Sequence, residues 1–419
     1  MAEKHSEAEQ LSRAALQLLE QGKVEAAAAC VKRAAAASPT SAETWCNLSI
    51  ALRMAQRFEE ARDAIDRALT LDPDRPETVE SYGILLHNMG DGKGAIRALN
   101  RALELSPGNA KTRWNRAIVA LANGDLRAGF ADHEARREIA ELAPRRFPMP
   151  SWSGERISGR TILVHTEQGF GDTLQFARYL PMLVGKGARV FFAVQPELLR
   201  LFQNVPGLAG VISIDGKLPL TDFHVPLLTL PLRFATTLDD VPATVPYIMP
   251  PQGLQATLAR APDTRLAVGI AWAGRPTHKY DRDRSMAIEE FLALSDLPGV
   301  ALYSLQTGAR SQDLAASGAG VLIRDCSAAL GDFADTATAL TQIDLVVCVD
   351  TALAHLAGAM GRNAFVLLPF VADWRWLRQR QDSPWYPTLR LFRQEKPGDW
   401  KSVIRRVREA VADLLGPRA

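Results

Sequence analysis

The sequence predicts an array of helical repeats followed by an α/β region in two lobes. Over the first part of the chain, residues of the same type recur at a constant spacing of 34 positions. Beyond Pro144, short apolar runs alternate with stretches of helical character, which is the pattern of parallel β-sheets covered by helices. The pair Pro250-Pro251 interrupts this second region. We therefore expect two lobes with a cleft between them.

Prolines and alanines set the phase of the repeat. Small residues let the two helices of a unit approach closely, and large residues fill the space between them. The units span residues 8–41, 42–75, 76–109 and 110–143. In the last unit Gly129 replaces an expected alanine, as in a terminal cap that docks on the next domain. The residues in phase are Pro39, Pro73 and Pro107, then Ala27, Ala61 and Ala95, and then Ala34, Ala68 and Ala102.

This pattern resembles the tetratricopeptide repeat. The resemblance implies stacked helix pairs with a concave face suited to peptides. We expect residues 8–143 to bind a protein partner through a short segment. A rigid spacer or an oligomerisation arm is the alternative that the pattern leaves open.

Composition narrows the class of protein. The 419 residues are 47% hydrophobic and 23% charged, with a net charge of +2, so no global electrostatic feature favours a nucleic-acid partner. The four cysteines are scattered without metal-type pairing, which favours a reduced, cytoplasmic protein. We expect no membrane span, because every apolar run is shorter than the roughly 18 residues that a spanning helix needs.

Six apolar runs predict the strands of the α/β region, at residues 161–165, 189–194, 266–272, 300–306, 343–349 and 364–368. A helix is expected over part of residues 176–186. The predicted parts are a linker at 144–157, a first lobe on the acceptor side at 158–250, a second lobe on the nucleotide-sugar side at 251–397, and a last helix at 398–416 that packs back on the first lobe.

The most informative segment is the turn after the run at 343–349. Asp350 and Thr351 end the strand, and the following residues predict a helix whose first turn Thr351 can cap. Ligands of open α/β sheets lie at such strand ends, and a helix N-terminus favours an anion such as phosphate. Asp350, Thr351, the Ala352 N–H and His355 are therefore candidate ligands of a phosphate-bearing molecule, although a simple cap and a buried histidine explain them equally well.

A second strand-to-helix turn carries Gly169, Gly171 and Asp172 directly after the run at 161–165. The glycines permit a tight turn and a close approach of the backbone. Asp172 stands at the helix N-terminus, where a carboxylate either caps the helix or acts as a general base toward a hydroxyl. The spacing is not that of a dinucleotide fingerprint, because Leu174 occupies the place of the third glycine.

The remaining candidates follow other strand ends. A basic loop suits a diphosphate, with Arg275, His278, Lys279 and Arg282 as ligands, unless it is only a solvated charged loop. Gln306 is a weaker candidate for a bond to a sugar or ribose. Trp374 and Trp385 are candidate stacking surfaces for a sugar or acceptor, or else core residues. The sequence holds neither a nucleophile-elbow motif nor a Walker-type phosphate loop, and it has no metal-type cluster, so we expect neither a metal nor a resident cofactor.

The second half resembles the GT-B glycosyltransferases, and within them the heptosyltransferase-like family 9. The residues that carry the resemblance are Gly171-Asp172-Thr173-Leu174 and the run from Asp350 to Ala357. The resemblance implies that Asp172 is the catalytic base, that the Asp350-Thr351-Ala352 segment and His355 hold the donor, and that Lys279 binds its diphosphate. Whole chains of this kind resemble bacterial proteins that join tetratricopeptide repeats to such a domain, some of them flagellin glycosyltransferases.

The combined prediction is a metal-independent, inverting glycosyltransferase. It would move a sugar from a nucleotide-sugar to a hydroxyl of a protein captured by the repeats. Two alternatives stay open at this point: transfer to lipopolysaccharide or another glycan, and a non-catalytic interaction protein built on the repeats.

Overall fold

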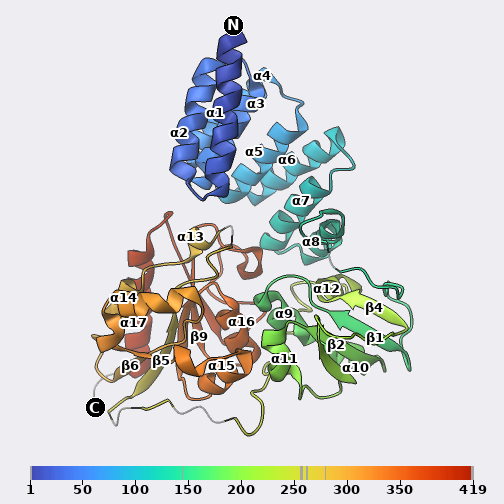
Figure 1. Cartoon of the computed structure of the whole chain (residues 1–419), viewed down its shortest axis with the longest axis vertical. Coiled ribbons are helices and arrows are strands. Elements are labelled where there is room, and N and C mark those ends of the chain that lie inside the picture. Colours follow the sequence, from blue (N-terminus) through green and yellow to red (C-terminus); the bar gives the residue numbers. More distant parts are fainter. Residues whose placement is uncertain (1, 144, 255–257, 261–262, 279, 417–419) are drawn as a thin grey trace. The chain divides into compact units, whose positions relative to one another are not determined.

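The computed structural model describes residues 2–143, 145–254, 258–260, 263–278 and 280–416 (Figure 1). It divides into two compact units, Met1–Glu141 and Leu142–Ala419. The first unit is entirely helical, and the second holds two parallel β-sheets with their helices.

The first unit consists of consecutive antiparallel helix pairs, in which each helix packs most closely on its neighbour in the chain. The alanines that set the sequence phase, such as Ala27, Ala61 and Ala95, are fully buried, because only a methyl group fits where the paired helices approach. The helices are α1 (Ala2–Glu20), α2 (Val24–Ala37), α3 (Ala42–Met54), α4 (Phe58–Leu71), α5 (Pro76–Asn88), α6 (Gly92–Leu105), α7 (Ala110–Ala122) and α8 (Leu126–His133), followed by η1 (Glu134–Glu138).

The turn inside each helix pair explains a further periodic residue. Gly22, Gly90 and Gly124 have φ angles of 72°, 96° and 87°, in the left-handed region that ends a helix and that glycine adopts without strain. The second pair has Gln56 at the equivalent place, one repeat after Gly22, with a φ of 59°. The tetratricopeptide architecture predicted from the sequence is therefore confirmed down to its turns.

The first lobe contains a four-stranded parallel sheet in the order β3-β2-β1-β4. Its strands are β1 (Thr161–His165), β2 (Arg189–Val194), β3 (Gly210–Ser213) and β4 (Phe223–Pro226). The sequence did not predict β3 and β4, which are only four residues long. The helices are α9 (Phe170–Phe176), η2 (Ala177–Tyr179), α10 (Leu180–Gly185), α11 (Pro196–Phe202), η3 (Leu227–Thr229) and α12 (Leu230–Arg233).

The second lobe contains a six-stranded parallel sheet in the order β10-β9-β8-β5-β6-β7. Its strands are β5 (Leu266–Ala271), β6 (Val300–Ser304), β7 (Ile323–Asp325), β8 (Leu345–Val349), β9 (Ala364–Leu368) and β10 (Leu389–Arg393). The helices are α13 (Asp281–Arg284), η4 (Ile288–Leu294), η5 (Ala309–Gln312), α14 (Asp313–Ala316), η6 (Ala319–Val321), η7 (Ser327–Ala329), α15 (Phe333–Leu340), α16 (Ala352–Ala359), η8 (Trp374–Trp376) and α17 (Trp400–Leu415).

Both sheets reverse their strand order beside their first strand. The chain moves outward from β1 to β3 and then returns to the other side of β1 for β4, and β5 has the same place between β6 and β8. Such switch points are where open α/β sheets bind ligands, at the carboxyl ends of the strands. The predicted fold class, helical repeats followed by two Rossmann-like lobes, is confirmed.

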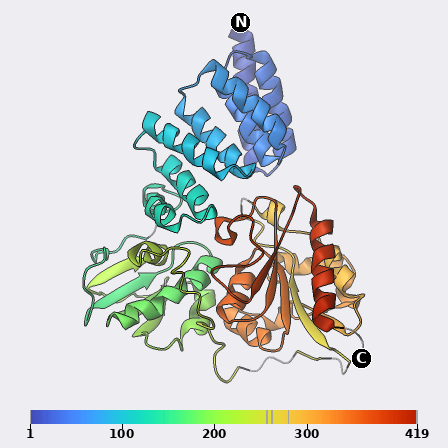
Figure 2. The ribbon, with the colours of Figure 1, turned by 180° about the vertical axis from the view of Figure 1, so that it is seen from behind.

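One predicted packing is wrong. The last helix, α17, does not pack back on the first lobe: it contacts η4 and β10 of the second lobe, and Figures 1 and 2 both draw it beside the second-lobe strands. Its apolar residues Val403, Val407 and Val411 are buried in the same core as β5 and β6. The sequence did not predict strand β10. Because β10 belongs to the second-lobe sheet and only a short connection joins it to α17, the helix packs on that sheet.

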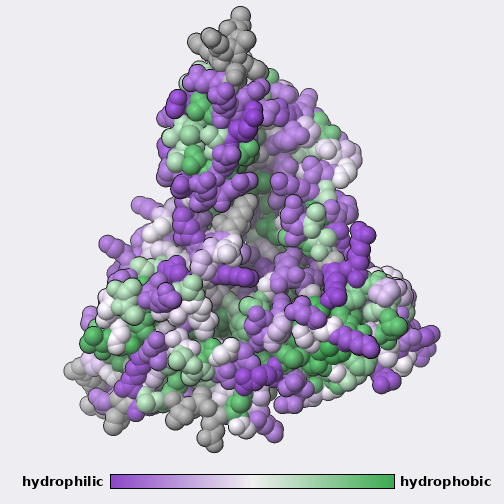
Figure 3. All heavy atoms as spheres, viewed as in Figure 1, coloured by the Kyte–Doolittle hydropathy of each residue, from purple (hydrophilic) through white to green (hydrophobic). Residues whose placement is uncertain are grey.

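The face drawn in Figure 3 carries hydrophilic side chains over both units, with apolar residues scattered between them. Among the described residues, every helix is too short or too polar to cross a lipid bilayer.

Candidate functional site

The two motifs singled out in the sequence meet in the second unit. Helix α9 of the first lobe packs directly on α16 of the second. The contact depends on Gly171, because a Cβ at this position would lie 2.8 Å from Cδ2 of His355. The glycine of the first motif therefore allows the backbone of one lobe to approach the histidine of the other.

Asp172 has two partners, one in each lobe. Its Oδ2 accepts a hydrogen bond from the Gly169 N–H at 2.8 Å, so the carboxylate closes the first turn of α9. Its Oδ1 forms an ion pair with Nη2 of Arg375, which follows β9 in the second lobe. Asp172 was predicted as the base from its own turn, whereas Arg375 was not predicted, because no local pattern links residues that are 203 positions apart.

Arg375 is held from two further sides. Oδ1 of Asp373 accepts hydrogen bonds from the Arg375 backbone N–H at 3.0 Å and from its Nη1 at 2.8 Å. The guanidinium carbon lies 4.3 Å from the centre of the Trp374 ring. Burial opposes the charge of Arg375, but the charges of Asp373 and Asp172 outweigh it and raise the pKa of the guanidinium. The side chain is thus a fixed cation beside the candidate base.

The turn after β8 adds a buried acid. Asp350 is 8% exposed, and burial, together with the negative charge of Asp373, raises its pKa to about 6 while the charge of Arg284 acts in the opposite direction. Arg284, the last residue of α13, also pairs with Asp281 at 3.4 Å. Arg284 is not among the ligands that the sequence predicted.

Thr351 is the N-cap residue of α16, but its side chain does not cap the helix, contrary to the prediction. The reason is that the Ala354 N–H donates to the backbone carbonyl of Thr351 at 3.1 Å, in place of the hydroxyl. The buried Oγ1 of Thr351 makes no hydrogen bond to a nitrogen or oxygen atom of the described residues, and its neighbour is the buried Cys348 thiol. A buried hydroxyl in this state at a helix N-terminus is a suitable donor to an anionic ligand.

His355 is a buried, neutral imidazole. Its Nδ1 is 2.9 Å from the hydroxyl of Tyr386, and its ring stacks on Trp376 with centroids 5.2 Å apart. Burial lowers the pKa of His355 to about 3 and raises the pKa of Tyr386 above its ordinary value, so both stay uncharged near neutral pH. Where the Tyr386 hydroxyl donates to Nδ1, Nε2 carries the proton, and where Nδ1 donates to the hydroxyl, Nε2 is an acceptor.

Three residues that were predicted as ligands are buried in the structure. Gln306 is 5% exposed and its amide is fully used: Oε1 accepts from the N–H groups of Trp272 and Ala273, and Nε2 donates to the Ala273 carbonyl. Trp374 and Trp385 are 3% and 0% exposed, so neither ring is open to stack on a sugar. These assignments were wrong because polar and aromatic residues that brace a loop or fill a core have the same local sequence as ligands.

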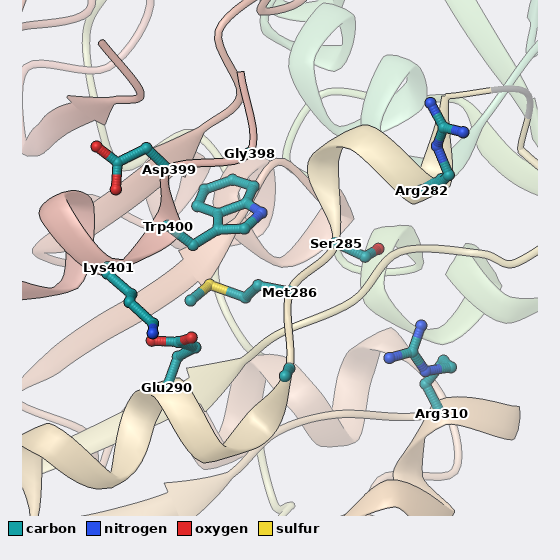
Figure 4. Close-up of a pocket in the computed structure, with 10 residues that line it drawn as sticks. Arg282, Ser285, Met286, Glu290, Arg310, Gly398, Asp399, Trp400 and Lys401 are labelled. Carbon is teal, nitrogen blue, oxygen red and sulfur yellow. The ribbon is translucent and has the colours of Figure 1, made fainter. Parts of the chain in front are cut away.

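The side chains of the basic segment after β5 lie in different surroundings. Arg275 and His278 are exposed, and Lys279 lies outside the described residues. Arg282 lines a cavity of about 620 Å³ that includes neither Asp172 nor Arg375. Figure 4 shows the indole of Trp400 beside Met286 in this cavity, with the Arg282 and Arg310 side chains on the opposite side. Among the described residues, no group of three histidine, cysteine or acidic side chains is arranged to hold a metal ion.

The close approach at Gly171 gives a testable expectation for stability. Gly171→Ala is expected to lower the free energy of unfolding by about 1–3 kcal/mol, because the imidazole that the methyl group would meet is fixed by Trp376 and Tyr386. Gly185→Ala is the matched control, since a Cβ there has no heavy atom within 4 Å. Urea unfolding of the full chain measures the stability of both variants. Equal midpoints would show that the close contact between α9 and α16 can be widened without a loss in the free energy of unfolding.

Comparisons with known proteins identify tetratricopeptide repeats in the first unit, and they find a relative whose similarity continues into the second unit. Residues 12–76 and 48–144 match models of the tetratricopeptide repeat. The chain is also similar to Protein FlbA of Caulobacter vibrioides, with 26% identity over 335 residues that make up 73% of this chain and 55% of that protein. The chain therefore spans about half the length of the curated relative it matches. Because the first unit ends at Glu141, this similarity must continue into the α/β unit.

Several solved structures are similar to a smaller share of the chain. The first tetratricopeptide domain of Spaghetti (RPAP3), bound to an HSP90 peptide, has 20% identity and a TM-score of 0.27, and the match covers 28% of this chain and 94% of that domain. PilF of Pseudomonas aeruginosa has 18% identity and a TM-score of 0.30, with coverage of 33% and 64%. A tetratricopeptide protein of Thermus thermophilus has 23% identity and a TM-score of 0.30, with coverage of 32% and 74%.

Proposed function

We propose that this protein is an inverting GT-B glycosyltransferase that needs no metal ion and uses a nucleotide-sugar as donor. The observation that carries the proposal is the pairing of Asp172 with Arg375: a carboxylate after β1 of one lobe meets a cation after β9 of the other. Transfer between a donor and an acceptor held by different lobes needs such a meeting of a base and a counter-charge.

In the proposed reaction an acceptor hydroxyl attacks the anomeric carbon of the donor sugar. A bond forms between the acceptor oxygen and this carbon, and the bond from the carbon to the diphosphate oxygen breaks. The electron pair leaves with the nucleoside diphosphate, and Asp172 takes the hydroxyl proton. Inversion follows because attack comes from the face opposite the leaving group.

The second lobe is proposed to hold the donor. Arg375 and Arg284 would offset the charge that develops on the diphosphate, with the exposed Arg275 and the loop residues His278 and Lys279 as further ligands. The N–H groups of Thr351 and Ala352 at the start of α16 and the buried Thr351 hydroxyl would donate to its oxygens. Neutral His355 would donate from Nε2 to the donor phosphate or sugar.

The acceptor is proposed to be a protein that the repeats capture. A row of large apolar residues supports this, because Leu16, Ile50, Ile84 and Ile118 occupy the same position in successive repeats. Leu16 is 59% exposed, and the other three are half-buried. Apolar side chains left at a surface at regular spacing suit an extended or helical segment of a partner.

A thermal-shift screen of the full chain against ADP-, UDP-, GDP-, CMP- and dTDP-sugars, with and without EDTA, tests this function. A ligand that binds only the folded state raises the apparent melting temperature by mass action. One nucleotide class is expected to raise it, EDTA is expected to leave the shift unchanged, and Arg284→Ala is expected to reduce it. A flat response to every donor would favour a non-catalytic interaction protein.

A further inference from the structure

The ion pair between Asp172 and Arg375 joins two groups that the proposed reaction needs separately. Both side chains are largely shielded from water, at 14% and 11% exposure. An oxygen that already accepts a charge-assisted hydrogen bond is less available to the proton of an incoming hydroxyl. In the same way, a nitrogen that already donates to Asp172 is less available to a diphosphate.

Each of the two groups keeps its position without the other. Asp172 is also bound through Oδ2 to the Gly169 N–H, at the first turn of α9. Arg375 donates from its backbone and from Nη1 to Asp373 and lies over the Trp374 ring. The contact between Oδ1 and Nη2 can therefore break without either side chain leaving its place.

The surroundings favour an exchange of partners at Arg375. The carboxylates of Asp172, Asp373 and Asp350 all act on its charge. The buried Thr351 hydroxyl, which has no nitrogen or oxygen partner among the described residues, precedes α16 in the same turn as Asp350. A planar guanidinium binds phosphate oxygens in a bidentate manner, which a single carboxylate oxygen does not match.

We infer that Arg375 has two partners in turn: Asp172 before the donor binds, and the donor diphosphate afterwards. This inference rests on the proposed function and adds a regulation to it. Binding of the nucleoside diphosphate-sugar releases Oδ1 of Asp172, so the base becomes available only when there is a sugar to transfer. The order of binding is then donor first and acceptor second.

The test measures binding of inorganic pyrophosphate to the full chain by isothermal titration calorimetry. Asp172→Asn keeps the shape of the side chain and an oxygen that can accept from the Gly169 N–H, but it removes the charge that competes for Arg375. This variant is expected to bind pyrophosphate about three- to thirtyfold more tightly than the unmodified chain. Asp172→Ala is expected to act in the same direction, and Arg375→Gln is expected to weaken binding by at least about tenfold.

The matched control is Asp335→Asn. Asp335 also caps the start of its helix, through the Gly331 and Asp332 N–H groups, and it also pairs with an arginine of the first lobe, Arg200, at 3.1 Å. Its replacement is expected to leave pyrophosphate affinity unchanged, which separates loss of the particular charge at Asp172 from loss of any ion pair between lobes.

Two results would overturn the inference, and they differ in what else they affect. If both Asp172 variants bind pyrophosphate no more tightly than the unmodified chain, while the unmodified chain binds a nucleotide-sugar and turns it over, the ion pair is a permanent link and only the exchange is wrong. If neither pyrophosphate nor any nucleoside diphosphate binds to any form of the chain, the proposed donor site is wrong as well.

Discussion

Asp172→Asn is expected to lower the rate of glycosyl transfer by about 10²–10⁴-fold, the range by which a positioned general base accelerates a reaction. The amide cannot take the proton of the acceptor hydroxyl, although its oxygen can still accept a hydrogen bond. The donor site remains, so the loss should lie in kcat at saturating nucleotide-sugar. Initial rates with the nucleotide class found in the thermal-shift screen measure the effect.

The control for this experiment is again Asp335→Asn, which shares the helix-capping position and the ion pair with a first-lobe arginine. Its rate is expected to stay within about twofold, since Asp335 has no role in the proposed proton transfer and partly exposed ion pairs contribute little to stability. Circular dichroism of both variants checks that they are folded. A rate within about threefold of the unmodified chain in Asp172→Asn would place the base on another residue.

The parts of this site that the sequence could predict are those encoded by neighbouring residues. A strand followed by Gly171-Asp172, and a strand followed by Asp350-Thr351, each indicate a ligand-facing turn because the carboxyl end of a strand, the turn and the helix start are consecutive in the chain. The repeats were predictable for a similar reason. A constant repeat length is visible without knowing which side chains touch.

The parts that could not be predicted depend on distant residues. Arg375 contacts Asp172 only because the fold brings the two residues together, and nothing in its own segment distinguishes it from a surface arginine. Trp385 lies within a run of aromatic residues that suits a sugar platform equally well, yet it is buried against Phe176 and beside Arg178. Whether a side chain is a ligand or part of the core is decided by packing, which local sequence does not encode.

Removal of residues 1–141 is expected to lower transfer to a protein acceptor by about 10²-fold or more while sparing nucleotide binding. The second unit has its own two sheets and cores, so the donor site does not require the repeats to fold. Tethering an acceptor by a second binding surface raises its effective concentration by about 10²–10⁴-fold, and this contribution disappears with the repeats. The thermal shift with the nucleotide-sugar and the rate with the protein acceptor are measured on the same preparation.

A point substitution makes the same test in the full chain. Leu16→Glu places a charge in the apolar row of the repeats, and Leu220→Glu is the matched control, because Leu220 is also an exposed leucine, 82% accessible, but lies in the second unit. If the row contacts the acceptor, Leu16→Glu should raise KM for the protein about fivefold or more, the cost of losing one well-packed contact, and Leu220→Glu should not.

Unchanged transfer to protein after both the deletion and Leu16→Glu would mean that the catalytic unit selects its acceptor alone. A free glycan, which needs no helical array to present it, would then be the acceptor to test, because the base and the diphosphate site do not distinguish a sugar hydroxyl from a serine or threonine hydroxyl.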